Sequence, residues 1–89
     1  MITPEYIISV VAEHYGVTPA DLSGNKRNSK IVMPRQVSMY LCREIISTPL
    51  KNIGKALGNR DHTTVMHGIE KIENELQNDD NLKKIPLIY

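Results

Sequence analysis

The sequence predicts a small all-α protein, folded as a compact bundle of helices. Apolar residues recur at helical spacing in several segments, and Pro, Gly and Asn separate these segments at short intervals. The 89 residues include no Trp or Phe, so aliphatic side chains must build most of the core. A chain of this length fits one domain with one core, and we expect residues 1–89 to form it.

The first helix is predicted to begin at Pro4. Thr3 suits an N-cap, proline is favoured as the first helical residue, and Gly16 ends the run. The positions expected to face inward are Ile7, Ile8, Val11, Ala12 and Tyr15.

A short helical turn and a basic loop are expected next. Thr18, Pro19 and Asp21 form a Thr-x-x-Asp start signal, which predicts a single turn through Leu22. Residues 23–33, SGNKRNSKIVM, mix Gly, Asn and Ser with cations and show no sustained period, so we expect a loop there.

Pro34 is expected to open the third helix, and Pro49 to lie beyond its end. On a helical wheel the face expected to point inward carries Val37, Leu41 and Ile45. The opposite face, expected to point outward, carries Arg35, Met39 and Arg43.

The last two helices are predicted to flank a glycine turn. A short helix over residues 50–57 is followed by a turn at Gly58 and Asn59, and a long helix starts at Arg60 or Asp61 and ends near residue 78. The apolar stripe of the long helix consists of Val65, Ile69, Ile72 and Leu76. A short helix, a turn and a longer helix over residues 50–76 form the layout of a helix-turn-helix. The tail, residues 79–89, is expected to add a turn or two or to be loosely held.

Charge is unevenly distributed although the net charge is only +1. Five cations and no acid lie between Leu22 and Arg43, whereas four acids and no cation lie between Glu73 and Asp80. Such a basic stripe is either a solvated surface or an electrostatic footprint for nucleic acid. In the second case Arg35 and Arg43, about 12 Å apart along a helix axis, would suit successive phosphates of one strand.

Several function classes find little support in the residues. Cys42 is the only cysteine, which excludes an internal disulfide and a multi-cysteine zinc site. No segment approaches the roughly 20 apolar residues of a membrane helix, and the start lacks the pattern of a secretory signal. His62 and His67 are five positions apart, not the four of a helical two-histidine metal site. We therefore expect a cytoplasmic protein without catalytic residues or metal ligands, and no enzyme activity.

The start of the last helix carries side chains suited to a base edge. In a helix-turn-helix the amino end of the second helix contacts bases in the major groove, and here it presents Asp61, His62 and Thr63. Asp accepts from the cytosine amino group, His donates or accepts, and the Thr methyl packs on the thymine methyl. Thr64, beside free backbone N–H groups, suits a phosphate. Asp before Thr-Thr is equally an ordinary helix cap, and the pattern leaves both interpretations open.

Two longer segments resemble a known family. Residues 58–72, GNRDHTTVMHGIEKI, resemble the signature of the C-terminal DNA-binding domain of bacterial DnaA replication initiators, and residues 26–45, KRNSKIVMPRQVSMYLCREI, resemble its basic loop and following helix. The likeness covers nearly the whole chain. It implies a Trp-repressor-like bundle that binds, as a monomer, to DnaA boxes in double-stranded DNA at replication origins. It also implies a nucleoid-associated location and contacts with replication-regulatory proteins in some bacteria.

The resemblance implies roles for individual residues. Arg27 is implied to enter the minor groove, and Asp61, His62 and Thr63 to read the major groove. Contacts with the DNA backbone are implied for Arg35, Gln36, Arg43, Thr64, His67 and Lys71. Leu50 and Lys51 are implied to lie near the backbone or a base at the entrance of the motif. The chain departs from the family pattern at three positions: Asn59 stands where glycine is frequent, Gly68 where alanine is frequent, and Lys51 where some members have proline. Gly68 lowers helix propensity by about 1 kcal/mol relative to alanine.

Two alternatives to origin binding stay open. A helix-turn-helix transcriptional regulator, or a free-standing DnaA-like domain acting at promoters, would share the motif, although a dimeric regulator would favour palindromic half-sites. A protein-interaction module would direct the same basic face toward an acidic partner. Family members of full length carry an ATPase domain, but this chain has no G-x-x-x-x-G-K-[ST] loop, so we expect no cofactor; ATP would belong only to a separate domain. The sequence does not distinguish an excised domain from a free-standing protein.

Overall fold

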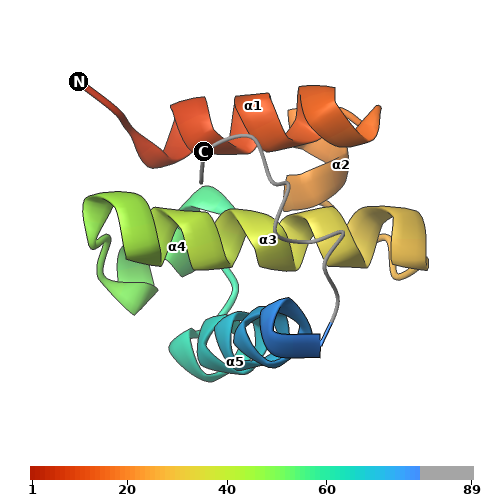
Figure 1. The fold of residues 1–89 in the computed structure, drawn as a ribbon. Coiled ribbons are helices and arrows are strands. Elements are labelled where there is room, and N and C mark those ends of the chain that lie inside the picture. The colour runs from red at the N-terminus through yellow and green to blue at the C-terminus, as the bar shows by residue number, and fades with distance from the viewer. Residues whose placement is uncertain (79–89) are drawn as a thin grey trace.

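Five helices form the protein in a computed structural model that describes residues 1–78. They are α1 (Pro4–Tyr15), α2 (Pro19–Ser23), α3 (Ser29–Ile46), α4 (Leu50–Ala56) and α5 (His62–Asn78). Helix α3 crosses the middle of the molecule, with α1 on one side and α5 on the other (Figure 1). The predicted all-α bundle with a helix-turn-helix is confirmed, and α4 and α5 form that motif. The prediction for the tail, residues 79–89, lies outside the described residues.

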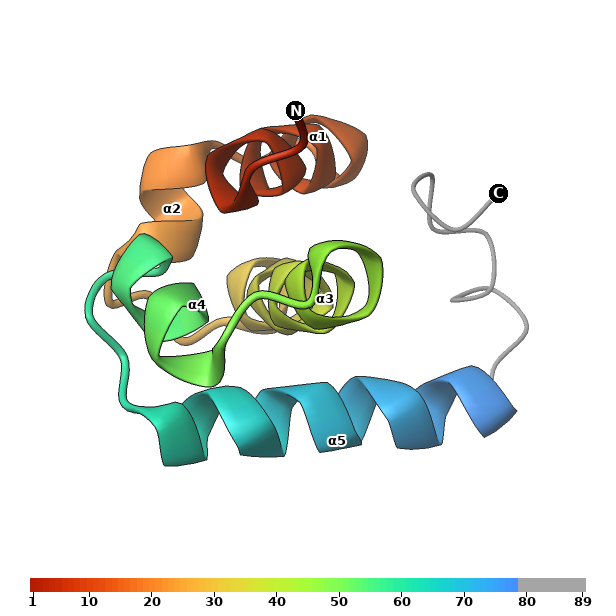
Figure 2. The same cartoon turned by 90° about the vertical axis from the view of Figure 1, so that its left-hand side faces the viewer.

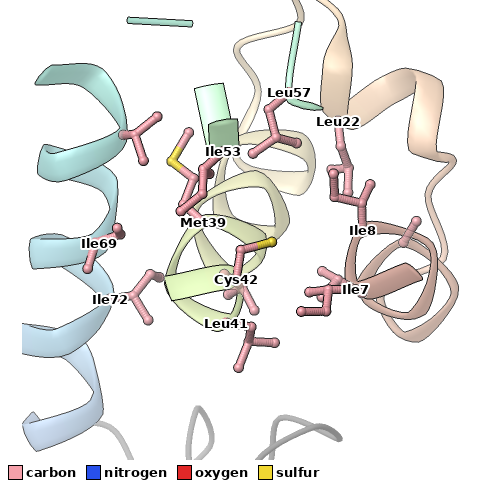
Figure 3. Close-up of a cluster of buried hydrophobic side chains, with 14 of the residues drawn as sticks. Ile7, Ile8, Leu22, Met39, Leu41, Cys42, Ile53, Leu57, Ile69 and Ile72 are labelled. Carbon is pink, nitrogen blue, oxygen red and sulfur yellow. The ribbon is translucent and has the colours of Figure 1, made fainter. Parts of the chain in front are cut away.

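The core lies on both sides of α3, because this helix packs against all four others. Ile7 and Ile8 of α1 approach α3 from one side, and Ile69 and Ile72 of α5 from the other (Figure 3). The largest fully buried side chains are aliphatic or sulfur-containing, as the composition predicts: Ile7, Val11, Leu22, Val37, Met39, Leu41, Cys42, Ile53, Leu57, Val65 and Ile72, each at most 1% exposed. Removal of these side chains from water provides the main driving force for folding.

The first two helices begin as the sequence predicts. Thr3 Oγ1 accepts a hydrogen bond from the backbone N–H of Tyr6 at 3.1 Å, and Gly16 ends α1 with a φ of 70°. Thr18 and Asp21 form a reciprocal capping box at the start of α2, with N···O distances of 3.0 and 3.1 Å. Both caps satisfy backbone N–H groups that the first helical turn leaves without partners.

Helix α3 begins at Ser29, so the prediction that Pro34 opens it is wrong. Proline lacks the N–H that would donate to the carbonyl of the residue four positions earlier, so α3 continues through Pro34 without one of its internal hydrogen bonds. Ile31, which the loop assignment left outside the helix, is 5% exposed and belongs to the core. Burial of this side chain favours a helical turn that the mixed composition of residues 23–33 did not indicate.

The predicted faces of α3 also need correction. Met39, expected to point outward, is 1% exposed, and Ile45, expected to point inward, is 36% exposed. The wheel assumed one buried face, but α3 is covered by α1 and α2 on one side and by α4 and α5 on another. A central helix of this kind buries side chains around most of its circumference.

Glycines allow the helix-turn-helix to close tightly. A Cβ at Gly54 would lie well under 3.0 Å from the carbonyl oxygen of Arg60, and one at Gly58 equally close to the carbonyl oxygen of Ser23. Gly58 and Asn59 have φ values of 81° and 62°, which confirms the predicted turn. Asn tolerates this left-handed conformation better than most residues, so Asn59 can follow Gly58 in the turn.

No helix within residues 1–78 combines the length and the apolar character needed to cross a membrane.

Helix α4 lies between α2 and the amino end of α5 (Figure 2). The turn before α5 therefore lies on the same side of the molecule as the segment that joins α2 to α3 (Figure 2).

Candidate nucleic-acid interface

The amino end of α5 is exposed, and Asp61 caps it. Asp61 Oδ1 accepts a hydrogen bond from the backbone N–H of Thr64 at 2.8 Å. This bond lowers the pKa of the Asp61 carboxyl, so the group is ionised at neutral pH. His62 and Thr63 are exposed beside it. The capping interpretation is confirmed, and the cap holds the carboxylate in a fixed position at the end of the helix.

The segment that follows α2 brings a cation close to this helix end. Because α3 begins at Ser29, the predicted loop of residues 23–33 is shorter in the structure, and we use the name basic loop for residues 25–28 from here on. These residues are exposed and include Arg27. A surface hollow of about 430 Å³ lies between the basic loop and α5, and it is lined by Asn25, Arg27, Arg35, Gly58, Arg60 and Thr64. Arg27 and Thr64, predicted from separate segments, therefore border one concave surface.

Arg35 does not lie where the sequence prediction placed it. It is only 6% exposed, and its guanidinium donates to four backbone carbonyl oxygens: Leu22 at 2.7 Å, Lys26 at 3.0 Å, Gly24 at 3.2 Å and Asp21 at 3.3 Å. Burial and the nearby charge of Arg60 lower its pKa. The prediction that Arg35 faces outward is wrong, because α3 has no free face at this position. Arg35 and Arg43 therefore do not form the predicted exposed pair that would contact successive phosphates of one strand.

Arg60 is a residue whose role the sequence analysis missed. From the turn before α5 it donates to the carbonyl of Leu57 and, through Nη2, to the carbonyl of Gly24 at 2.6 Å. Burial lowers its pKa. The only signal in the sequence was its position directly before the Asp-His-Thr-Thr run, and the sequence analysis interpreted Arg60 as a possible first residue of the last helix.

Arg43, Leu50 and Lys51 lie near the entrance of the helix-turn-helix. Arg43 is exposed and donates from Nη1 to the carbonyl of Thr48 at 3.2 Å. Arg43 and the half-buried Leu50 border a hollow lined also by Glu44, Met66, Ile69, Glu70 and Glu73. A second hollow is lined by Lys51, Lys55, Asn59, Arg60, Asp61 and His62, so Lys51 lies on the same surface as the start of α5.

The remaining predicted residues lie along α3 and α5. His67 and Lys71 are exposed, one and two turns beyond Thr63. Gln36 is half-buried, and its Oε1 is buried without a hydrogen-bond partner among the described residues. The amide nitrogen is therefore the end of Gln36 that remains for a partner outside the chain.

Most cations of this face have no acidic partner. Within residues 1–78 one ion pair is formed, between Lys26 Nζ and Asp21 Oδ1 at 3.0 Å, and both groups are on the surface. The hydrogen bond from Lys26 lowers the pKa of Asp21. Over the same residues no three His, Cys, Asp or Glu side chains are grouped so that they could hold a metal ion. Arg27, Arg43 and Lys51 therefore present positive charge to solvent.

A family described as the bacterial dnaA protein helix-turn-helix matches residues 4–72. The chain belongs to this family. The matched range contains every residue for which the sequence predicted a DNA contact. Within the DnaA family match, α4 and the first turns of α5 form the helix-turn-helix.

Curated relatives agree with the DnaA family match. The chain is 54% identical over 84 residues to the chromosomal replication initiator protein DnaA of Oenococcus oeni, and the aligned residues make up 94% of the chain and 19% of that protein. It is 53% identical over 77 residues to the protein of the same name from Latilactobacillus sakei, covering 86% of the chain and 17% of the relative. The protein of that name from Thermomicrobium roseum is 46% identical over 82 residues, covering 92% and 18%. The chain spans less than a fifth of the length of these relatives.

Proposed function

We propose that this domain binds double-stranded DNA sequence-specifically, at DnaA-box-like sites of a replication origin, and so serves replication initiation and its regulation. One observation supports this most directly: the exposed amino end of α5 and the exposed Arg27 loop border the same hollow. The similar proteins are named chromosomal replication initiators, which directs the proposal to origin DNA. Such a role places the domain on the nucleoid in the cytoplasm.

The major groove is the proposed site of α5. A helix is narrow enough to enter this groove, where each base pair presents its own pattern of donors, acceptors and methyl groups. Asp61, ionised and fixed by its cap, would accept from a cytosine amino group. His62 and Thr63, both exposed, would contact the neighbouring base edges.

The minor groove is the proposed site of Arg27. Its guanidinium is exposed on a loop beside the start of α5, so it can reach the groove that adjoins the major-groove site. Narrow A·T-rich minor grooves concentrate negative potential and attract arginine. A reader in each of two adjacent grooves makes the site asymmetric, which suits binding by a monomer.

Phosphate contacts would set the register of the domain on the duplex. The exposed or half-exposed donors available for this are Gln36, Arg43, Lys51, Thr64, His67 and Lys71. Leu50 would lie close to the DNA backbone. Arg35 is left out of this set because it is only 6% exposed and its Nε and Nη2 donate to backbone carbonyls within the chain. Contacts of this kind position a protein but carry no direct sequence information. We assign the domain to binding, without catalysis and without a cofactor.

A titration of two labelled duplexes tests the proposal. One duplex carries a DnaA box, the other carries the same bases scrambled, and both are measured at several salt concentrations. The wild type is expected to prefer the box by at least about 10³-fold. Thr63→Ala and Arg27→Ala should each lose about 1 to 3 kcal/mol on the box and little on the scrambled duplex. Equal affinity of the wild type for both duplexes would refute sequence-specific binding.

A further inference from the structure

The carbonyl oxygen of Gly24 accepts hydrogen bonds from two arginines on different elements. Arg60 donates from the turn before α5 at 2.6 Å, and Arg35 donates from α3 at 3.2 Å. Gly24 directly precedes the basic loop of residues 25–28. One backbone oxygen therefore connects the start of that loop both to the central helix and to the helix-turn-helix.

Arg35 also fixes the chain on both sides of Gly24. It donates to the carbonyl of Leu22 before the loop and to that of Lys26 within it, at 2.7 and 3.0 Å. Lys26 is the residue directly before Arg27. The backbone leading to Arg27 is therefore held by one buried guanidinium.

Two more contacts close the same junction between α2 and the helix-turn-helix. Ser23 Oγ donates to the carbonyl of Ala56 at 3.4 Å. Gly58 packs so closely on the carbonyl of Ser23 that a side chain there would overlap it. The turn before α5 and the end of α2 thus lie in direct backbone contact, and the basic loop starts from this contact.

The chemistry of the junction is costly for a purely structural contact. The guanidinium groups of the buried Arg35 and the half-buried Arg60 lie close together, and carbonyl dipoles instead of carboxylates compensate them. Apolar side chains of similar size often stabilise a fold as well as buried charges do. Guanidinium groups add what apolar side chains lack, namely several donors in a fixed planar arrangement that fix where a backbone lies.

We infer that Arg35 and Arg60 are positioning residues, which hold the Arg27 loop at a fixed distance from the start of α5 and so determine DNA sequence specificity without contacting DNA. The inference rests on the proposed function, because it assumes that Arg27 and α5 read adjacent grooves. Both readers can meet their base pairs at once only when the distance between them matches the distance between the two grooves. A loop released from α5 must be ordered during binding, which weakens binding to the matching sequence.

The first test is made on the free protein. Arg60→Lys keeps the charge but replaces the fork of donors that reaches Leu57 and Gly24 with a single ammonium group. Backbone order parameters from ¹⁵N relaxation should be about 0.85 for residues 25–28 in the wild type and should fall below about 0.6 in the variant. Ser23→Ala is the matched control, because it removes one side-chain hydrogen bond of the same junction and leaves both guanidinium groups in place. An unchanged loop in Arg60→Lys would overturn the inference.

The second test measures specificity with the box and scrambled duplexes. Arg60→Lys should bind the box about tenfold more weakly, bind the scrambled duplex within about twofold of the wild type, and keep the wild-type salt slope. Ser23→Ala should match the wild type in all three. Equal losses on both duplexes, with a salt slope reduced by about 1, would mean that Arg60 contacts a phosphate, and would overturn the inference.

Arg35→Lys provides a second variant measured in the same way, and circular dichroism confirms that each variant is folded before binding is measured. If Arg60→Lys does not fold, Arg35→Lys decides the outcome by the same criteria. If the wild type itself binds both duplexes equally, the proposed function fails, and the order parameters of the loop alone decide whether the two arginines hold it.

Discussion

Replacing Gly54 with alanine should destabilise the domain even though alanine is the better helix former. Alanine gains about 1 kcal/mol of helix propensity in α4. Its Cβ, however, would overlap the carbonyl oxygen of Arg60 and lie 3.1 Å from the carbonyl carbon, and neither atom can rotate away because both belong to the backbone. Overpacking of this kind costs about 1 to 3 kcal/mol. The displaced turn also weakens the hydrogen bond from Arg60 N to Gly54 O, 3.0 Å long, worth about 0.5 to 1.5 kcal/mol.

The net loss expected for Gly54→Ala is about 0.5 to 3.5 kcal/mol, against the roughly 5 to 15 kcal/mol that stabilises a typical domain. Urea denaturation followed by circular dichroism measures it, and the melting temperature should fall by about 4 to 8 °C for each kcal/mol. Lys55→Ala, at the next and exposed position of α4, is the control and should stay within about 0.5 kcal/mol of the wild type. A Gly54→Ala protein as stable as the wild type would show that α4 and the turn do not lie in backbone contact.

Four further predictions concern other sites. Gly68→Ala should be neutral or destabilising in urea denaturation, because its Cβ would lie 2.5 Å from Met39 Sδ; a gain of the full propensity, about 1 kcal/mol, would contradict this packing. The Cys42 thiol should react with Ellman's reagent only in denaturant, because burial raises its pKa to about 12; fast labelling of the native protein would contradict its burial. Arg43→Ala should weaken binding to all DNA sequences alike and lower the log-log salt slope by about 1, and an unchanged slope would exclude a phosphate contact. Asp61→Asn should be less stable than the wild type near pH 7. Because the folded-state pKa of Asp61 lies below 3.8, this difference should shrink as the pH falls below about 4, and a difference that persists in acid would exclude the ionised cap.

The sequence predicted those helices whose ends are marked by local chemistry. Thr3, Pro4 and Gly16 defined α1, and Gly58 with Asn59 defined the turn of the helix-turn-helix, because caps and turns depend on a few neighbouring residues. The apolar stripe of α5 was predicted from its period, since one face of this helix meets the core and the other meets solvent.

The sequence was least informative for α3, where tertiary contacts decide the structure. Residues 29–33 are helical because Ile31 packs in the core, although Pro34 locally favours a helix that starts at its own position. Arg35 was assigned to the surface because the helical wheel placed it opposite Val37 and Leu41, but the carbonyls that bind its guanidinium come from α2 and the basic loop. No pattern within α3 indicates those partners. The exposed residues of α5 were easier to place, because the stripe of its buried side chains fixes which positions face solvent.

The arginines of this domain suggest how it should respond to ionic strength. Arg35 and Arg60 are held by backbone carbonyls, and the single ion pair within residues 1–78 lies at the surface. Mobile ions screen attractions between exposed charges far more than they weaken short, shielded hydrogen bonds to neutral groups. Concentrated sodium chloride should therefore detach the domain from a polyanion while its melting curve barely changes. A purification that elutes it from heparin with salt should yield folded material, ready to rebind once the salt is diluted.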